Sequence, residues 1–568
     1  MIVRNEAHII RELLDAVAPY ISTWVIVDTG SDDGTQDLIT NHMAQLGIRG
    51  ELYERPWQNF GHNRTEALSL AQGHADYIWV IDADDAVVGT PDFSQLSADA
   101  YFLRYKDAVS TLWRPQLFRN GASWHYKGVI HEYAVCDGPC VSARLAGEYH
   151  IGARSLGARS LDPQRFARDR DLLLAEVERN PEDTRSVFYL AQSYFDLGDF
   201  ANARTWYARR VELGGWAEEA YIALYQVAES MSRLGAPWPE VLDAFLKAWE
   251  FRPTRSEPLY AIAHRYRTSA RYRLGYLFAR QAAETPYPQA DVLLVRAEVY
   301  AWRALDEQAV CASWIGKHAE AFALWRSLLT NPDIPDEDLR RMVNNRIICA
   351  RTMINTALSY PDAVVQSLLT RPHTAPDAAK VVVSLVAGPD RASTEHTVNS
   401  FLNCCTDVSR VERFLLLDDG LSAQDRAALQ ERYAFIEFAD PSSDRNRVTQ
   451  LVHLRAQIHA QYWLHLGQGW RFFAAESFIG RLIAVLQAEP HVFQVGINFT
   501  DADTLTGAYA AEDTVRRAPH AGRYVLSDAV ANGPAMFDTT RLDQAGGFTA
   551  TAGLPTASLD EILCVATV

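Results

Sequence analysis

An apolar stretch that ends in carboxylates, residues 77–85, is the feature that most constrains the fold. It reads Tyr-Ile-Trp-Val-Ile-Asp-Ala-Asp-Asp, so β-favouring residues lead directly to Asp82, Asp84 and Asp85. A short apolar run bounded by polar residues is typical of a buried strand. Open α/β sheets bind ligands at the carboxyl ends of their strands, and neighbouring carboxylates suit a hard cation such as Mg²⁺ or Mn²⁺. The stretch therefore predicts an α/β domain with a cation site, and a solvated acidic turn is the alternative.

Strand and helix patterns alternate before this stretch. We predict strands ending at Arg4, over 24–28 and over 51–54, and helices over 8–18, from 35 onward and over 63–71. Such alternation indicates a parallel α/β sheet. Only three residues precede Arg4, fewer than the usual five or six of a strand, so either the natural chain begins upstream or this strand is clipped.

Four short motifs occur in order within the first 85 residues. They are Met-Ile-Val-Arg-Asn-Glu at 1–6, Val-Asp-Thr-Gly-Ser-Asp-Asp-Gly-Thr at 27–35, Asn-Phe-Gly-His-Asn-Arg at 59–64 and Asp-Ala-Asp-Asp at 82–85. Each is weak alone, but together they resemble the family 2 glycosyltransferases with a GT-A fold. The resemblance implies a nucleotide-sugar donor, a divalent cation (Mn²⁺ or Mg²⁺) and inversion at the anomeric carbon.

The resemblance also implies which residues bind the donor and the metal. Asp28 would accept hydrogen bonds from the nucleotide base, and Arg64 would bind the diphosphate as a bidentate cation, unless it is an exposed helix arginine. The metal ligands would be Asp84, Asp82 and His150, the last of which could instead be an ordinary polar residue at a domain edge. The full donor-binding set is Arg4, Asn5, Glu6, Asp28, Arg64, Asp82 and Ala83.

Glu132 is the predicted catalytic base. It lies in Trp-His-Tyr-Lys-Gly-Val-Ile-His-Glu-Tyr at 124–133, a region in which related transferases carry the carboxylate that takes the acceptor's proton. A carboxylate partly desolvated beside aromatic rings has a raised pKa that suits a base. The alternative is a surface strand glutamate, with His131 facing the other side of the strand.

Residues 163–359 change to a helical pattern. Leu190-Ala191 with Tyr194, followed by Gly198, Phe200, Ala203 and Tyr207, resembles one tetratricopeptide repeat, and similar spacings recur near 263 and 316. The pattern predicts a solenoid of three to five helical hairpins. Solenoids present a concave face to partners, so this region would bind a protein or peptide acceptor or act as a rigid spacer.

A strand pattern returns after a proline-containing segment at 361–378. Val381 to Val386 is strand-like, and Asp418-Asp-Gly repeats the shape of the Asp28 turn. Where a second acidic motif is expected, residues 467–469 are Gly-Gln-Gly. This region resembles a second GT-A domain that has lost its metal site.

Composition excludes some classes of partner. Net charge is −17, from 54 basic and 71 acidic residues, which argues against nucleic acid. No apolar run of about 18 residues and no signal segment occur, so the cytoplasm is the expected location. Seven cysteines, including Cys136 and Cys140, fit a reduced compartment and are interpreted as small apolar residues.

The sequence therefore predicts a multidomain α/β and all-α enzyme. Its expected parts are a GT-A domain at 1–160, a tetratricopeptide-like solenoid at 161–360, a linker at 361–378 and a degenerate GT-A-like domain at 379–568. It would transfer a sugar to an acceptor, such as a protein or peptide side chain, by metal-assisted transfer. The alternatives are a glycan or polysaccharide acceptor, or a non-catalytic scaffold with sugar-binding domains.

Overall fold

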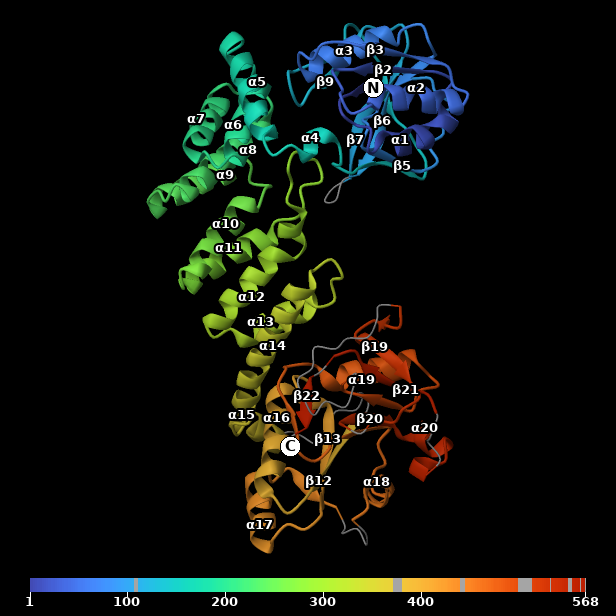
Figure 1. Ribbon diagram of the computed structural model, residues 1–568. Coiled ribbons are helices and arrows are strands. Elements are labelled where there is room, and N and C mark those ends of the chain that lie inside the picture. Colours follow the sequence, from blue (N-terminus) through green and yellow to red (C-terminus); the bar gives the residue numbers. More distant parts are fainter. Residues whose placement is uncertain are drawn as a thin grey trace. The chain divides into compact units, whose positions relative to one another are not determined.

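The computed structural model (Figure 1) describes residues 1–106, 111–370, 381–439, 445–498, 513–531, 533–549, 554–561 and 563–566. The chain forms two compact units. The first comprises Met1–Ile262 with Thr285–Ala297, and the second comprises Ala263–Glu284 with Glu298–Val568. Within the described parts of the chain, no helix combines the length and apolar character that a membrane span requires.

The first unit opens with a three-stranded parallel sheet covered by helices (blue in Figure 1). Its strand order is β1 (Ile2–Val3), β2 (Trp24–Asp28) and β3 (Gly50–Glu54). The helices are α1 (Ile10–Val17), η1 (Ala18–Tyr20), α2 (Thr35–Gln45) and α3 (Phe60–Leu70). Helix α1 buries Ile10, Leu13, Leu14 and Val17, the apolar face that its helical spacing predicts.

A second, mixed sheet follows, so the parallel pattern ends at β3. Its order is β4 (Tyr77–Trp79), β7 (Thr111–Arg119), β6 (Ala100–Lys106), β11 (Tyr149–Ala153) and β5 (Asp85–Gly89), with β10 (Ser142–Arg144) paired to β6. The predicted strand of the 77–85 stretch is present as β4, but it pairs antiparallel with β7. A hairpin of β8 (Trp124–Lys127) and β9 (Tyr133–Cys136) lies beside α3.

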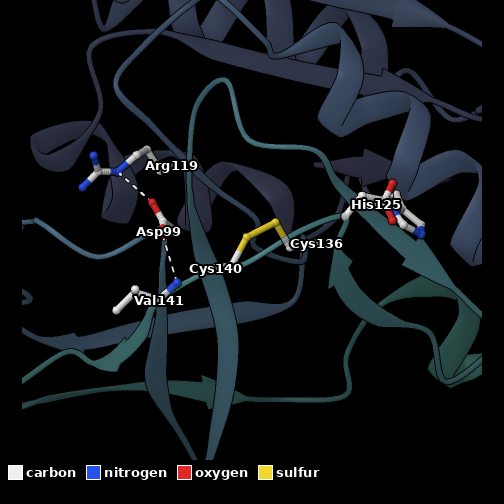
Figure 2. Close-up of a disulfide and its surroundings, with 7 residues drawn as sticks. Asp99, Arg119, His125, Cys136, Cys140 and Val141 are labelled. Carbon is white, nitrogen blue, oxygen red and sulfur yellow. Dashed lines mark hydrogen bonds and ion pairs between the residues drawn. A yellow bond between two sulfur atoms is a disulfide. The ribbon is translucent and has the colours of Figure 1, made fainter.

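Cys136 and Cys140 form a disulfide, with sulfur atoms 1.99 Å apart. It joins the last residue of β9 to the segment that follows, near Asp99, which accepts a hydrogen bond from the Val141 N–H at 2.9 Å (Figure 2). The interpretation of this pair as small apolar residues is therefore wrong, because the turn brings the two Cα atoms to 6.6 Å. The other five cysteines are free and buried, as that interpretation predicted.

Antiparallel helices follow in both units. In the first unit they are α4 (Ala158–Leu161), α5 (Arg165–Arg179), α6 (Thr184–Asp196), α7 (Phe200–Glu212), α8 (Ala217–Arg233) and α9 (Trp238–Phe251), after which α10 (Glu257–Thr268) begins. Leu190, Ala191, Ala203 and Tyr207 of the predicted repeat are all fully buried between helices. The second unit contains α11 (Tyr272–Glu284), the π-helical turn η2 (Val299–Arg303), α12 (Ala304–Trp314), α13 (His318–Leu328), α14 (Asp336–Ala357) and α15 (Asp362–Leu369).

An irregular segment, residues 285–297, is held against the helices of the first unit by buried charges. Glu218 accepts hydrogen bonds from the N–H groups of Val292 and Leu293 at 2.8 and 2.7 Å. Arg255, which is 1% exposed, donates to the carbonyls of residues 293 and 294 at 3.2 and 3.0 Å. The helices of the first unit therefore bind the main chain of this irregular segment.

The C-terminal domain contains a nine-stranded sheet. Its order is β14 (Ile436–Phe438), β13 (Val411–Asp418), β12 (Val381–Ala387), β15 (Tyr462–His465), β20 (Ala535–Asp538), β17 (Gln494–Gly496), β21 (Thr556–Leu559), β19 (Gly522–Ser527) and β18 (Arg516–Ala518). A small sheet pairs β16 (Trp470–Phe472) with β22 (Cys564–Ala566). The helices are α16 (Arg391–Cys404), η3 (Val408–Arg410), α17 (Ala423–Arg432), α18 (Arg447–Ala456), α19 (Phe478–Ala488), α20 (Thr539–Gln544) and η4 (Gly547–Thr549).

The predicted fold class is confirmed: an α/β N-terminal domain, a repeat-like helical region and a sheet-rich C-terminal domain. One apolar core in the second unit runs from Trp302 of the helices to Val565 of the last strand. The predicted linker contains α15, and its residues 371–378 lie outside the described residues. The predicted limits of the domains remain predictions.

Candidate active site

Arg64 lies between two carboxylates. From α3, its Nη2 donates to Asp82 Oδ1 at 2.6 Å, and its Nε lies 2.5 Å from Glu132 Oε1. Arg114 of β7 contacts the other oxygen of Asp82 at 3.4 Å. The side chains of Arg64 and Glu132 are only 7% and 8% exposed, so neither is the surface residue of the alternative interpretation. The structure thus brings together three predicted site residues that are far apart in sequence.

The two arginines keep Asp82 ionised. Burial alone would raise the pKa of this carboxyl group, but Arg64 and then Arg114 lower it to about 2. Asp85 behaves oppositely, because burial and the nearby Asp82 raise its pKa to about 7. Asp85 accepts hydrogen bonds from the Asp82 N–H and the Tyr105 hydroxyl, both at 3.0 Å. The Asp85 hydrogen bonds therefore stabilise the backbone of the acidic turn, whereas the ionised Asp82 pairs with Arg64 and Arg114.

Arg64 Nη1 and Asp28 Oδ2 are among the buried polar atoms that lack a hydrogen-bond partner in the described residues. The other oxygen of Asp28 accepts hydrogen bonds from the Gly30 and Ser31 N–H groups, each at 2.9 Å, and from Gln36 at 3.0 Å. Buried polar groups are normally hydrogen-bonded. An acceptor and a cationic donor left open here fit a ligand that carries both an N–H group and an anionic group.

The residues after β1 tie this strand end to the Asp28 turn. Asn5 has a left-handed backbone (φ 59°), and its N–H donates to Ser31 Oγ at 2.9 Å. The Glu6 N–H donates to Thr35 Oγ1 at 2.9 Å. Arg4 is exposed and Ala83 is buried. The Asn5 and Glu6 contacts therefore order the rim of the site.

Asp84 and Glu6 place carboxylate oxygens beside one another. Asp84 Oδ2 accepts a hydrogen bond from the Gly157 N–H at 3.1 Å, and Glu6 Oε1 accepts one from the Ala158 N–H at 3.3 Å. A Cβ placed on Gly157 would lie 3.2 Å from the Glu6 oxygen and 3.3 Å from the Asp84 oxygen. Burial, with a contribution from Asp84, raises the pKa of Glu6 to about 7.

These carboxylates fit a hard cation, whereas His150 does not join them. In the β11–β5 ladder His150 pairs with Val88, while Ala153 pairs with Asp85. His150 therefore lies three residues, or about 10 Å, further along the strand. In the ranges that the structure describes, no three His, Cys, Asp or Glu side chains are grouped to hold a metal ion. Mg²⁺-type sites commonly combine one or two carboxylates with substrate phosphates, a donor set that Asp84 and Glu6 match.

Glu132 ends a loop, residues 128–132, that connects β8 to β9, so it is not the strand glutamate of the alternative interpretation. His131 has a left-handed backbone (φ 51°) and does not alternate with Glu132 across a strand. The loop lies against the start of α3, where the Phe60 N–H donates to the Val129 carbonyl at 3.1 Å. A Cβ on Gly61 would lie 2.3 Å from the Gly128 oxygen, so only glycine permits this approach. Helix α3 therefore positions both Arg64 and the base loop (residues 128–132).

Arg114, Tyr105 and Gly157 also contribute to the site, although none of them was predicted from the sequence. Arg114 carried one usable signal, since it is a lone charge beside Trp113 within a run of β-favouring residues. Gly157 carried none, because its role depends on where the chain passes after β11.

The C-terminal domain has a turn like that of Asp28, but both carboxylate oxygens of its aspartate have partners. Asp418 Oδ1 accepts hydrogen bonds from the N–H groups of Gly420 and Leu421 at 3.0 and 2.9 Å, as Asp28 does in its own turn. Its second oxygen, however, is paired with Arg426 at 3.2 Å. Among the described residues, the Asp418 turn therefore lacks the open acceptor of the Asp28 turn. After β15, where a second acidic motif is expected, the chain has Gly467 and Gly469 in place of carboxylates.

The fold and site define an α/β domain with acidic and cationic groups at its strand ends. Residues 1–127 match the model of Glycosyl transferase family 2, which is 127 of 568 residues. A TPR repeat-containing protein of Synechococcus elongatus is 27% identical over 312 residues, which cover 50% of this chain and 73% of that protein. The chain therefore joins a family 2 glycosyltransferase domain to tetratricopeptide-like repeats.

Solved structures resemble parts of the chain. GalNAc-T7 with UDP, GalNAc and Mn²⁺ is 10% identical with a TM-score of 0.29, covering 34% of this chain and 45% of its own, so the chain spans less than half of that protein. A mannosyltransferase from Pyrobaculum calidifontis, in complex with GDP-Man and Mn²⁺, is 13% identical with a TM-score of 0.26, covering 39% of this chain and 68% of its own. YrrB, a TPR protein, is 16% identical with a TM-score of 0.25, covering 32% of this chain and 82% of its own. At these TM-scores the three likenesses assign no activity.

Proposed function

We propose that the chain is a metal-dependent glycosyltransferase that moves a sugar from a nucleotide-sugar to an acceptor nucleophile. The observation that carries this proposal is the buried Arg64, placed between Asp82 and Glu132 with Nη1 open among the described residues. A guanidinium group in this setting suits a diphosphate. The open Asp28 oxygen suits the N–H of a nucleotide base.

Each side chain then has a defined task. Asp28 accepts a hydrogen bond from the base, and Arg64 with Arg114 binds the diphosphate. Asp84 and Glu6 would hold the divalent cation, which when bound neutralises charge on the departing diphosphate. Asp82 orients the two arginines through its ion pairs.

Glu132 acts as the general base. One of its oxygens lies against Arg64, and the carboxylate takes the proton of the acceptor as the acceptor attacks the anomeric carbon. The bond from that carbon to the diphosphate oxygen breaks as the new glycosidic bond forms, so the product is inverted. The helical region supports a protein or peptide acceptor, since such solenoids present extended binding surfaces.

The difference between the two sheet-containing domains argues against a purely non-catalytic scaffold. The acidic turn is open in the first domain at Asp28 and closed by Arg426 in the second. A chain used only for binding would have no reason for one of its two sites to retain the carboxylates.

Release of nucleoside diphosphate from a panel of nucleotide-sugars in Mn²⁺ tests the proposal. Wild type is expected to turn over one donor, and Glu132→Gln to lower kcat by about 10²–10⁴-fold with little change in donor KM. The exposed Glu148→Gln in the same domain should match wild type. Absence of turnover, together with no donor-induced thermal stabilisation across the panel, would refute the proposal.

A further inference from the structure

We propose that Arg185 and Tyr189, on the first repeat-like helical hairpin, are positioning residues for the catalytic base Glu132. This inference rests on the proposed function and adds a role for the helical region in catalysis. Both residues lie on α6, and their contacts are with the base loop of the glycosyltransferase domain in the same compact unit.

Arg185 binds the peptide group that precedes Glu132. Its Nε and Nη2 both donate to the carbonyl oxygen of His131, at 3.1 and 3.0 Å. A guanidinium fork with two bonds to one oxygen restricts both the position and the orientation of that peptide. Because the next backbone atom is the Glu132 nitrogen, the fork limits where the glutamate side chain begins.

Aromatic contacts hold the residues on both sides of Glu132. The rings of His131 and Tyr189 stack with centroids 3.8 Å apart and planes at 14°. The Arg185 guanidinium lies over the Tyr189 ring at 5.1 Å and over the Tyr133 ring at 5.0 Å, within the range of cation–π attraction. Helix α6 therefore contacts the neighbour before Glu132 and the neighbour after it.

The backbone of His131 needs such support. Its φ of 51° lies in the left-handed region, which residues other than glycine rarely adopt. Strained conformations of this kind persist where the surrounding structure holds them, and they gather at functional sites. Here the supporting contacts come from α6 and from an apolar core in which loop residues Val129 and Ile130 pack with residues of α5 and α6, namely Leu173, Val177, Val187 and Leu190.

Arg185 is itself anchored deeper in the helical region. Its Nη1 lies 3.5 Å from Glu219 Oε1, and the other oxygen of Glu219 accepts from Nη2 of the fully buried Arg210 at 2.9 Å. The contacts therefore run without interruption from the interior of the repeats to the peptide beside the base. We infer that the first helical hairpin is part of the active site, and that separating it from the glycosyltransferase domain would misplace Glu132.

The test combines hydrogen exchange with kinetics on the full chain. Arg185→Ala and Tyr189→Ala are compared with Tyr189→Phe, which keeps the ring, and with Arg209→Ala, which removes an exposed arginine paired with Glu212. In the two disruptive variants we expect amide exchange of residues 128–133 to rise at least tenfold. We also expect kcat for transfer to fall about 10–100-fold, the cost of a small misplacement of a catalytic group. The two control variants should change neither quantity.

Nucleotide affinity distinguishes misplacement of Glu132 from loss of the nucleotide-binding site. Mn²⁺-dependent binding of the product nucleoside diphosphate should stay within about twofold of wild type in all four variants. The described contacts of Arg185 and Tyr189 involve none of the residues predicted to bind the donor. Unchanged exchange of residues 128–133 in Arg185→Ala and Tyr189→Ala would overturn the inference, whether or not a donor has been found. Absence of turnover by wild type, together with no donor-induced thermal stabilisation, would instead refute the proposed function and leave the exchange result to decide the inference.

Discussion

Replacing Arg255 by methionine should release the irregular segment at 285–297 from the helices of the first unit. Arg255 is 1% exposed and pairs with Glu257, which is 2% exposed, at 2.8 Å, and with Asp291, which is 3% exposed, at 3.4 Å. Breaking a buried ion pair costs about 3–5 kcal/mol, because the remaining charge keeps its desolvation penalty. Arg252 still binds Asp291, at 2.5 Å, so the penalty falls mainly on Glu257. We therefore expect the lower end of this range, about 3 kcal/mol.

Hydrogen exchange on the full chain measures this effect locally. A loss of about 3 kcal/mol corresponds to roughly 150-fold faster exchange of the 285–297 amides, if the segment opens as a unit. The exposed pair of Lys247 and Asp243, at 2.7 Å, supplies a control, since Lys247→Met should change stability by less than about 0.5 kcal/mol. Exchange of the segment within threefold of wild type in Arg255→Met would refute the reasoning.

Two further predictions concern pH and packing. Burial lowers the pKa of His465 to about 3, so below pH 6.5 the unfolded chain binds a proton that the folded chain does not. Stability in urea should therefore fall by about 2 kcal/mol between pH 7 and pH 5 through this group. His465→Gln should remove this part of the pH dependence of stability, whereas His491→Gln, at an exposed histidine, should not. An equal pH dependence in both variants would contradict the role given to His465. Gly61→Ala should lower stability to thermal unfolding by about 1–3 kcal/mol, because its Cβ would meet the Gly128 oxygen at 2.3 Å. Gly152→Ala, whose Cβ would have ordinary contacts at 3.7 Å, should match wild type, and equal losses in the two would argue against close packing at Gly61.

The parts of the fold that follow from local patterns could be predicted from the sequence. Apolar spacing in α1 and in the repeat around Leu190 and Tyr207 is local, and these residues are buried as expected. Pairing of distant strands is not local. The predicted parallel sheet ended at β3, and β4 paired with β7, which begins more than thirty residues later.

The same distinction applies to the site. Asp28, Arg64, Asp82 and Glu132 could be proposed from short motifs, and the structure brings the last three into contact. Sequence spacing alone could not place His150, because the register between β11 and β5 decides which residue of β11 lies beside the acidic turn. In the structure that residue is Ala153, and His150 lies beside Val88.

Turns and long-range contacts explain the remaining differences. The Cys136–Cys140 disulfide depends on a turn whose geometry a separation of four residues does not specify. The contact between Arg185 and the His131 carbonyl joins residues 54 positions apart, and no local pattern marks it.

The most direct test of the central claim is Mn²⁺-dependent binding of nucleoside diphosphates, measured by calorimetry with UDP, GDP, ADP and CDP. Wild type should bind one of them, Asp84→Ala should lose the Mn²⁺-dependent part of the affinity, and Asp418→Ala in the C-terminal domain should bind as wild type does. Binding that survives in Asp84→Ala and disappears in Asp418→Ala would place the nucleotide site in the C-terminal domain and contradict the account.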